Sequence, residues 1–196
     1  MAVHGGATMD RRPLLTFGTT ALWLGILAVF GAQALSGQDK YTVQVPGGLA
    51  FAEFRGYENW QLVSISQNGK LMAAILGNPT IIEAFRSGIP TNGKPFPEGS
   101  RMAKVHWIPK VNENQPGPPT VPGAQHDVDF MVKDSKRFAD AGGWGFAVFN
   151  YDPASDTFAP GTTADHPPQG HDAKCGVACH TKAKATDFVF TAYPRR

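Results

Sequence analysis

The sequence is poor in cysteine and in charge. It has two cysteines in 196 residues, and there is no second cysteine pair to complete a structural zinc site. Charged residues make up 17 % of the chain, the formal net charge is +2 and no basic block is present, so we do not expect nucleic acid as a partner. Glycine and proline are plentiful, at 22 and 16 residues, which predicts many turns and loops. The length predicts one domain once the N-terminus is set aside.

Both cysteines lie near the C-terminus, in Cys175-Gly-Val-Ala-Cys179-His180. Two thiols that can each add to a haem vinyl group, followed directly by an imidazole, form the arrangement that covalent haem attachment requires. The spacing is three residues rather than the usual two, and the two small residues predict a compact loop. We therefore predict haem c bonded to Cys175 and Cys179, with His180 as axial iron ligand. The alternative is a disulfide between the cysteines, in a ring short enough to be strained.

The N-terminal segment, residues 1–34, has the features of an export signal. Two arginines precede an uncharged apolar run, and Ala32-Gln33-Ala34 fits a small-X-small cleavage site. The uncharged stretch continues to Gln38, so the segment could instead remain as a membrane anchor. Both interpretations place a haem domain of residues 41–196 in the periplasm, either free or held at the inner membrane.

Hydrophobic patterns along residues 41–196 predict an α+β domain with an antiparallel sheet of about five strands and two or three helices. Asn78-Pro79 is a typical helix start, and Gly88 is expected to end that helix. The many helices of ordinary small c-type cytochromes are not predicted. Strands are expected at 61–66, 71–76, 101–108, 127–133, 144–149 and 187–193, with a short lead-in strand at 41–46 and loops at 112–123 and 151–172.

Side chains alternate between the faces of a strand, so the patterns at 101–108 and 127–133 predict which residues share a face. One face is apolar and is predicted to lie in the hydrophobic core: Ala103, Val105, Trp107, Val128, Phe130 and Val132. The other is mixed: Met102, Lys104, His106, Ile108, Asp127, Asp129, Met131 and Lys133. Lys104 is either a solvated lysine or a pocket lysine. Asp129 is either a surface carboxylate, a partner for Lys104, or a general base. His106 is expected to bond to a neighbour.

Several segments, in this order and spacing, resemble the cytochrome P-460 family. They are Phe96-Pro-Glu-Gly99, Ala103-Lys-Val-His-Trp107, Met131-Val-Lys-Asp-Ser-Lys-Arg-Phe138, Gly142-Gly-Trp-Gly145 and the late Cys-X-X-X-Cys-His motif. The resemblance covers about residues 57 to 193. It implies a β-rich periplasmic protein with one haem, often a dimer, with five-coordinate iron. It also implies either oxidation of hydroxylamine or, as in the related cytochrome c′-beta proteins, binding of nitric oxide.

The resemblance further implies roles for single residues. In the family's enzymes a lysine is bonded covalently to the porphyrin, and Lys104 matches it by position. The distal carboxylate matches Asp129, with Asp127 second, so Lys104 and Asp129 are the expected catalytic residues. The family's distal arginine is expected within 71–78, and this stretch has none.

The expected partners are a small nitrogenous ligand or substrate and a periplasmic electron acceptor. The alternative function is a haem protein without enzymatic activity, which either binds gas or transfers electrons. Electron transfer would require a second axial ligand, a histidine or a methionine. The candidates are His166 and His171, in the loop before the haem motif, and Met102 and Met131.

Overall fold

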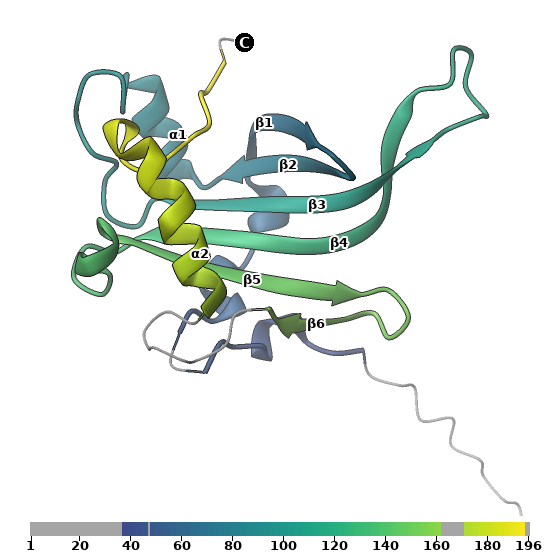
Figure 1. Ribbon diagram of the computed structural model, residues 1–196, viewed down its shortest axis with the longest axis horizontal. Coiled ribbons are helices and arrows are strands. Elements are labelled where there is room, and N and C mark those ends of the chain that lie inside the picture. The colour runs from purple at the N-terminus through teal and green to yellow at the C-terminus, as the bar shows by residue number, and fades with distance from the viewer. Residues whose placement is uncertain (1–36, 47, 162–170, 195–196) are drawn as a thin grey trace, which may run out of the picture. The chain divides into compact units, whose positions relative to one another are not determined.

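A six-stranded antiparallel sheet, with its strands in chain order from one edge to the other, organises the described part of the chain (Figure 1). The strands are β1 (Gln61–Asn68), β2 (Leu71–Gly77), β3 (Arg101–Val111), β4 (Thr120–Lys133), β5 (Trp144–Asp152) and β6 (Thr157–Pro160). The helices are α1 (Pro79–Arg86) and α2 (His171–His180), with short 3-10 helices at Lys40–Thr42, Phe51–Phe54, Tyr57–Asn59, Ala139–Ala141 and Thr181–Thr186. The predicted α+β class is confirmed, with one strand more than expected.

This computed structural model describes residues 37–46, 48–161 and 171–194, and for 171–175 the backbone alone. The export segment predicted at 1–34 lies outside the described residues. Within them, no helix has the length and hydrophobicity needed to cross a membrane.

The predicted helix start is confirmed by its hydrogen bonds. The side-chain oxygen of Asn78 accepts a hydrogen bond from the Ile81 backbone N–H at 3.1 Å, and Pro79 occupies the first turn. The same Asn78 oxygen accepts from the Arg101 backbone N–H at 3.0 Å. The cap therefore also fixes where α1 begins relative to β3.

Two predicted strands are wrong. Residues 41–46 contain the end of a 3-10 helix and one isolated bridge, from Gln44 to Ala50, because this segment folds back on the residues that follow it rather than joining the sheet. Residues 187–193 are not a strand, because Asp187 and Phe188 have φ values of 49° and 64°, which turn the chain out of the extended conformation.

Two predicted loops contain regular structure. Residues 157–160, within the loop expected at 151–172, form β6 on the outer side of β5. Residues 120–123, within the loop expected at 112–123, begin β4 and extend the β3–β4 hairpin beyond its neighbours (Figure 1).

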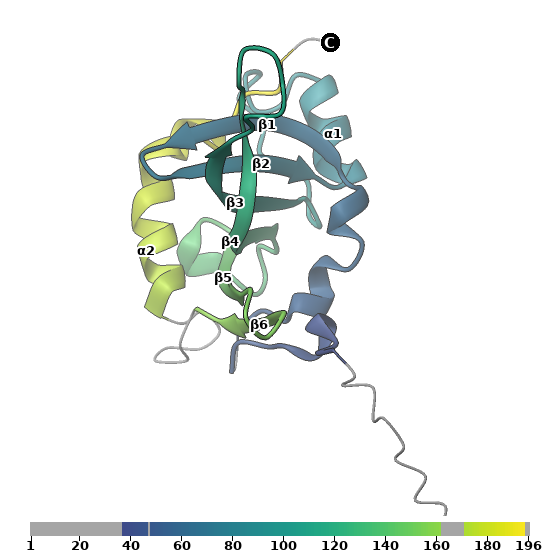
Figure 2. The same ribbon diagram turned by 90° about the vertical axis from the view of Figure 1, so that its right-hand side faces the viewer.

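The sheet divides the core in two, as the alternation of β3 and β4 predicts. On one face, Ala103, Val105, Val128 and Phe130 pack with the 3-10 helices of residues 51–59. On the other face, Met102 and Met131 pack with Trp144, Phe146 and residues of α1. Figure 2 shows α2 and the 3-10 helices of the N-terminal region on opposite sides of β3 to β5. A strand residue's position in the alternation therefore decides which of the two environments it enters.

Phe51 is the centre of the first cluster, and we expect Phe51→Ala to lower the free energy of unfolding by about 3–5 kcal/mol, as for other large core aromatics. Its side chain is fully buried. Its ring contacts five others with centroids 4.9–5.9 Å away: Tyr41, Tyr57, Phe130, Phe149 and Phe158. Urea unfolding followed by circular dichroism measures the change. Ile65→Ala is the control, because Ile65 is 66 % exposed and should cost less than ~0.5 kcal/mol. Equal costs for both variants would contradict this assignment of the core.

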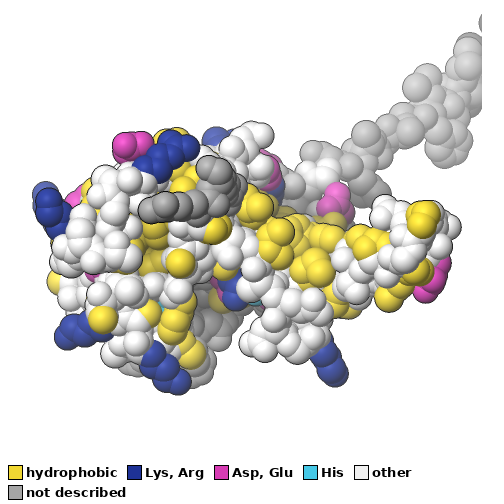
Figure 3. Space-filling view, turned by 90° about the horizontal axis from the view of Figure 1, so that it is seen from above, with side chains coloured by type: hydrophobic (Ala, Val, Ile, Leu, Met, Phe, Trp, Pro, Cys, Tyr) yellow, Lys and Arg dark blue, Asp and Glu magenta, His cyan; other side chains and the backbone are white. Residues whose placement is uncertain are grey.

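Exposed hydrophobic side chains gather toward the end of the fold at which the β3–β4 hairpin projects (Figure 3). Ile108 and Val111 of β3 each keep about half of their surface exposed, and Ile65 of β1 keeps more. Apolar surface of this kind is typical of contact sites. The homodimer expected from the family resemblance stays a prediction.

Candidate functional site

A cavity of about 160 Å³ opens on the sheet face that carries the mixed residues of β3 and β4. Its walls come from β2, β3, β4 and β5, from the end of α2 and from the C-terminal segment. The lining residues are Ile75, Met102, Lys104, Asp129, Phe130, Met131, Phe146, His180, Val189, Phe190 and Thr191. A mostly apolar wall with a few convergent polar groups is typical of a ligand or cofactor site.

The register of the sheet places the two predicted catalytic residues side by side. Lys104 of β3 pairs with Asp129 of β4, and Ile75 of β2 pairs with Lys104 on its other side. Residues directly opposite one another in adjacent strands share a face, so all three side chains line the cavity. The structure thus places Lys104 and Asp129 at the cavity.

The predicted axial ligand, His180, lies at the end of α2 and lines the same cavity. Its ring packs between Phe146 and Phe190, with centroid distances of 4.9 and 5.1 Å. Its Nδ1 lies 2.6 Å from the backbone oxygen of Phe188. A carbonyl oxygen only accepts, so Nδ1 carries the hydrogen and Nε2 keeps its lone pair.

Burial lowers the pKa of His180, and the positive charge of Lys104 acts in the same direction. The imidazole is therefore neutral at neutral pH, which is the form that binds a metal. A hydrogen bond from the other ring nitrogen to a carbonyl is also the usual way in which proteins orient a metal-binding histidine.

The Cys-X-X-X-Cys-His motif lies on a helix and not in the compact loop that was predicted. Cys175 and Cys179 are one turn apart on α2. The Cys179 side chain is exposed and free, while the side chain of Cys175 lies outside the described residues. Gly176 fits tightly on β5, since a Cβ at this position would lie 3.3 Å from the Phe146 side chain. The glycine therefore lets α2 approach the cavity wall closely.

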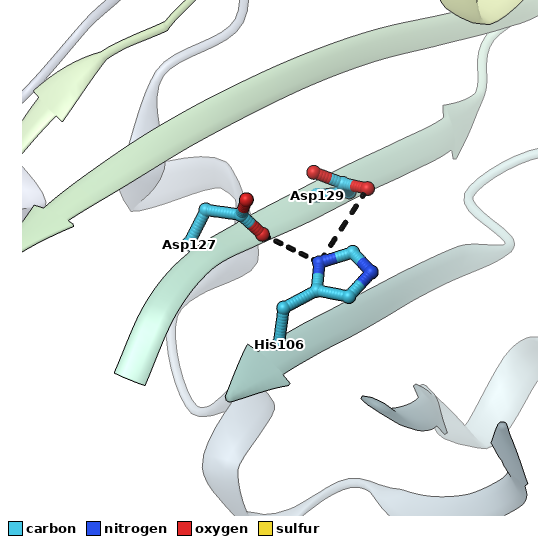
Figure 4. Close-up of side chains that lie close together, drawn as sticks. All are labelled: His106, Asp127 and Asp129. Carbon is cyan, nitrogen blue, oxygen red and sulfur yellow. Dashed lines mark hydrogen bonds and ion pairs between the residues drawn. The ribbon is translucent and has the colours of Figure 1, made fainter. Parts of the chain in front are cut away.

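A cluster of imidazole and carboxylate groups adjoins Asp129, as Figure 4 shows. His106 Nδ1 lies 2.5 Å from Asp127 Oδ1 and 3.8 Å from Asp129 Oδ2. On the other side, His126 Nδ1 lies 2.6 Å from Asp127 Oδ2, and the His126 side chain is half exposed. The expectation that His106 bonds to a neighbour is confirmed. The cluster joins a residue of the cavity wall to the protein surface.

The two carboxylates of this cluster have opposite pKa shifts. Burial alone would raise the pKa of Asp127, but hydrogen bonds to His106 and His126 outweigh it, and the pKa of Asp127 is lowered. For Asp129, burial raises the pKa to about 6, and the negative charge of Asp127 acts in the same direction. Asp129 can therefore gain and lose a proton near neutral pH, which is what a general base needs.

Sequence reasoning missed several contributors to the site. The pairing of His106 with Asp127 follows from the register of β3 and β4, so a correct register would have predicted it. The carbonyl of Phe188 carries no sequence signal. The position on β2 that faces the cavity holds Ile75, and no arginine occurs among the described residues that line it. The distal arginine that the family resemblance led us to expect is thus found neither among the described lining residues nor within residues 71–78.

No curated protein sequence matches the chain. The model of one protein family, Cytochrome P460, matches residues 54–191, which is well over half of the chain. The match spans the sheet, the cavity and the Cys-X-X-X-Cys-His motif. The chain belongs to the cytochrome P460 family, and this membership implies a haem cofactor.

Proposed function

We propose that this protein is a periplasmic c-type cytochrome with one haem, and that it oxidises hydroxylamine and passes the electrons to an external acceptor. The observation that carries the proposal is the convergence of His180, Lys104 and Asp129 on one cavity. Lys104 and Asp129 come from the paired strands β3 and β4, and His180 comes from α2, more than 40 residues later in the chain. They are the candidate cross-linking lysine, the candidate base and the candidate metal ligand.

The residues present fit a haem. The neutral His180 keeps Nε2 as a donor for iron, and its Nδ1–H is already bound to a carbonyl. The cavity wall is mainly apolar, which suits a porphyrin face. Cys179 is exposed at the surface of the helix that ends in His180, so its thiol is accessible for attachment. In the proposal, Cys175 and Cys179 hold the porphyrin by thioether bonds.

When bound, haem c supplies the iron that binds the nitrogen substrate and the porphyrin through which its electrons leave. The chain supplies the handling of protons. Asp129, ionised above a pH of about 6, accepts the proton that hydroxylamine releases as it loses electrons. In the chain without haem, the free Lys104 ammonium adds positive charge to the same wall and lowers the proton affinity of Asp129, against the effects of burial and Asp127.

The test uses protein exported from cells that contain the haem-attachment machinery. We expect a coloured protein whose haem resists acid-acetone extraction, a five-coordinate ferrous spectrum, and reduction of an electron acceptor that depends on hydroxylamine. Colourless protein, or a haem that extracts freely, would disprove the covalent cytochrome. A stable haem without hydroxylamine turnover would limit the proposal to ligand binding.

A second candidate function is electron transfer or gas binding without turnover. Met102 and Met131 both line the cavity, so a thioether is available as a second axial ligand. The β2 residue that lines the cavity, Ile75, is apolar. An apolar wall at this point suits a diatomic gas better than hydroxylamine. A six-coordinate low-spin ferrous spectrum would identify the electron-transfer form, and nitric oxide binding without turnover would identify the gas binder.

We further propose that Lys104 is bonded to the porphyrin, and we expect Lys104→Ala to remove this bond. The ferrous Soret band should then move to the position of an ordinary c-type haem, because the cross-link alters the macrocycle. Tryptic mapping of the wild-type protein should find the porphyrin on the Lys104 peptide as well as on the cysteine peptide. Lys110→Ala is the control, since Lys110 is an exposed lysine of the same strand. An unchanged Soret band in Lys104→Ala, with unchanged turnover, would rule the cross-link out.

A further inference from the structure

A buried lysine ends β4 on the cavity side of the sheet. Lys133 is 5 % exposed. Its Nζ donates to both carboxylate oxygens of Asp187, at 2.8 and 3.1 Å, and to the Gly142 carbonyl at 3.1 Å. It also lies 5.2 Å from the centre of the Trp144 ring. A buried ammonium group is costly unless it is paired with a negative charge. Movement of Asp187 away from Lys133 would leave the lysine unpaired, so the ion pair holds Asp187 in place.

Asp187 is fixed by more than the ion pair. Its Oδ2 accepts a hydrogen bond from the Phe96 backbone N–H at 2.7 Å. Its backbone is left-handed, as is that of Phe188, with φ values of 49° and 64°. Aspartate tolerates this conformation, but a bulky residue adopts it only where the surroundings hold it there. The chain at 187–188 is therefore held in a conformation that it would not adopt by itself.

The ring of Phe188 is held from the other side by a glycine. A Cβ at Gly142 would lie 2.2 Å from the Phe188 ring, so only glycine leaves room for it. Gly142 also has a φ of 68°, which favours glycine, and its carbonyl accepts the hydrogen bond from Lys133. The Lys133 ammonium and the Phe188 ring thus meet at the same turn between β4 and β5.

The backbone held in this way carries the partner of the predicted iron ligand. The Phe188 carbonyl oxygen lies 2.6 Å from His180 Nδ1. One further bond, from the Phe188 N–H to the Ala183 carbonyl at 2.9 Å, closes the chain back on the helix that follows His180. A continuous set of contacts therefore runs from Lys133 through Asp187 and Phe188 to the imidazole.

We propose that the Lys133–Asp187 ion pair is a positioning device for His180, which fixes the Phe188 carbonyl and so sets the orientation and donor strength of the imidazole toward a metal. The inference rests on the part of the proposed function that makes His180 the haem ligand, and is independent of hydroxylamine chemistry. Lys133 and Gly142 do not line the cavity, and the proposal assigns them a function in supporting His180.

The test measures the iron–histidine stretching band of the ferrous haem protein by resonance Raman spectroscopy, together with the midpoint potential. The variants are Lys133→Met and Asp187→Asn, with Lys136→Met as control, because Lys136 is an exposed lysine three residues further on. Asp187→Asn is decisive, since asparagine also adopts left-handed backbone and keeps the acceptor for the Phe96 N–H. We expect both variants to shift the stretching band to lower wavenumber and to raise the potential, because a weaker bond at Nδ1 makes the imidazole a weaker donor.

A shift in both variants, with Lys136→Met unchanged, supports the proposal. An unchanged band and potential in Asp187→Asn would overturn it, as would failure of Asp187→Asn alone to accumulate as a folded haem protein, which would show that the pair serves the whole fold. If the wild-type protein itself shows no iron–histidine band, the haem assignment fails instead.

Discussion

His180→Gly is expected to lower hydroxylamine turnover by at least about 100-fold, since removal of a metal ligand should cost more than loss of the groups that support it. His180 is the imidazole that lines the cavity, and its lowered pKa keeps it neutral. The haem should stay attached through the cysteines, but its ferrous spectrum should lose the features of an iron–histidine bond. Absorption spectra and steady-state assays measure both effects.

Added imidazole should restore part of the spectrum and of the turnover in His180→Gly, because the deleted ring leaves space between Phe146 and Phe190. Lys182→Gly is the matched control. It places a glycine at an exposed position just after α2 and should leave both properties unchanged. An iron–histidine band that survives in His180→Gly would mean that another residue binds the iron.

Asp129→Asn is expected to lower turnover by about 10²–10⁴-fold, the range usually supplied by a general base. The wild-type rate should also depend on pH in a defined direction. Asp129 accepts a proton only when ionised, and burial raises its pKa to about 6. At saturating hydroxylamine, kcat should therefore fall about tenfold for each pH unit below that value, and this acidic limb of kcat should be missing in the variant. Rates measured from about pH 5 to about pH 8 test the expectation. A wild-type rate that is flat across this range would contradict it.

Protein stability gives an independent check on the same residue. The pKa of Asp129 is higher in the folded protein than its ordinary value of 3.8. Ionisation therefore costs the folded state, and stability falls as the pH rises from about 4 through about 6. Asp129→Asn should raise the melting temperature above pH 6 and leave it unchanged below pH 4. The gain should be modest, because the Asp129 side chain is 40 % exposed. Asp140→Asn, at an exposed position, should change neither rate nor stability.

The site could be predicted from the sequence where strands alternate cleanly. The pattern of β3 and β4 assigned Val105 and Phe130 to the core, and Lys104 and Asp129 to the other face, and the structure confirms this division. A period of two residues suffices here because one face is almost purely apolar. The same argument did not reach the bond between His106 and Asp127, because pairing across strands depends on the register and not on the pattern within one strand.

The parts that were missed depend on contacts between distant residues. The motif segment 171–180 is helical, although it has no apolar stripe to show it, and Gly176 fits it onto Phe146 of β5. The C-terminal stretch alternates like a strand. However, the left-handed backbone at Asp187 and Phe188 is imposed by Lys133 and Gly142, more than 40 residues earlier in the chain. No local pattern records such a constraint.

Because β4 places alternate side chains in the aromatic core and at the cavity, insertions and deletions within this strand should be poorly tolerated. Adding one residue between Asp127 and Asp129 would exchange the faces downstream, turning the Phe130 side chain out of the aromatic core and placing Asp129 in it. The turn at 112–119 joins strands that project beyond the rest of the sheet, so a length change there leaves every pair from Lys104–Asp129 to Met102–Met131 in register. Length variation among natural relatives should therefore concentrate in that turn and be rare within the seven residues from Asp127 to Lys133.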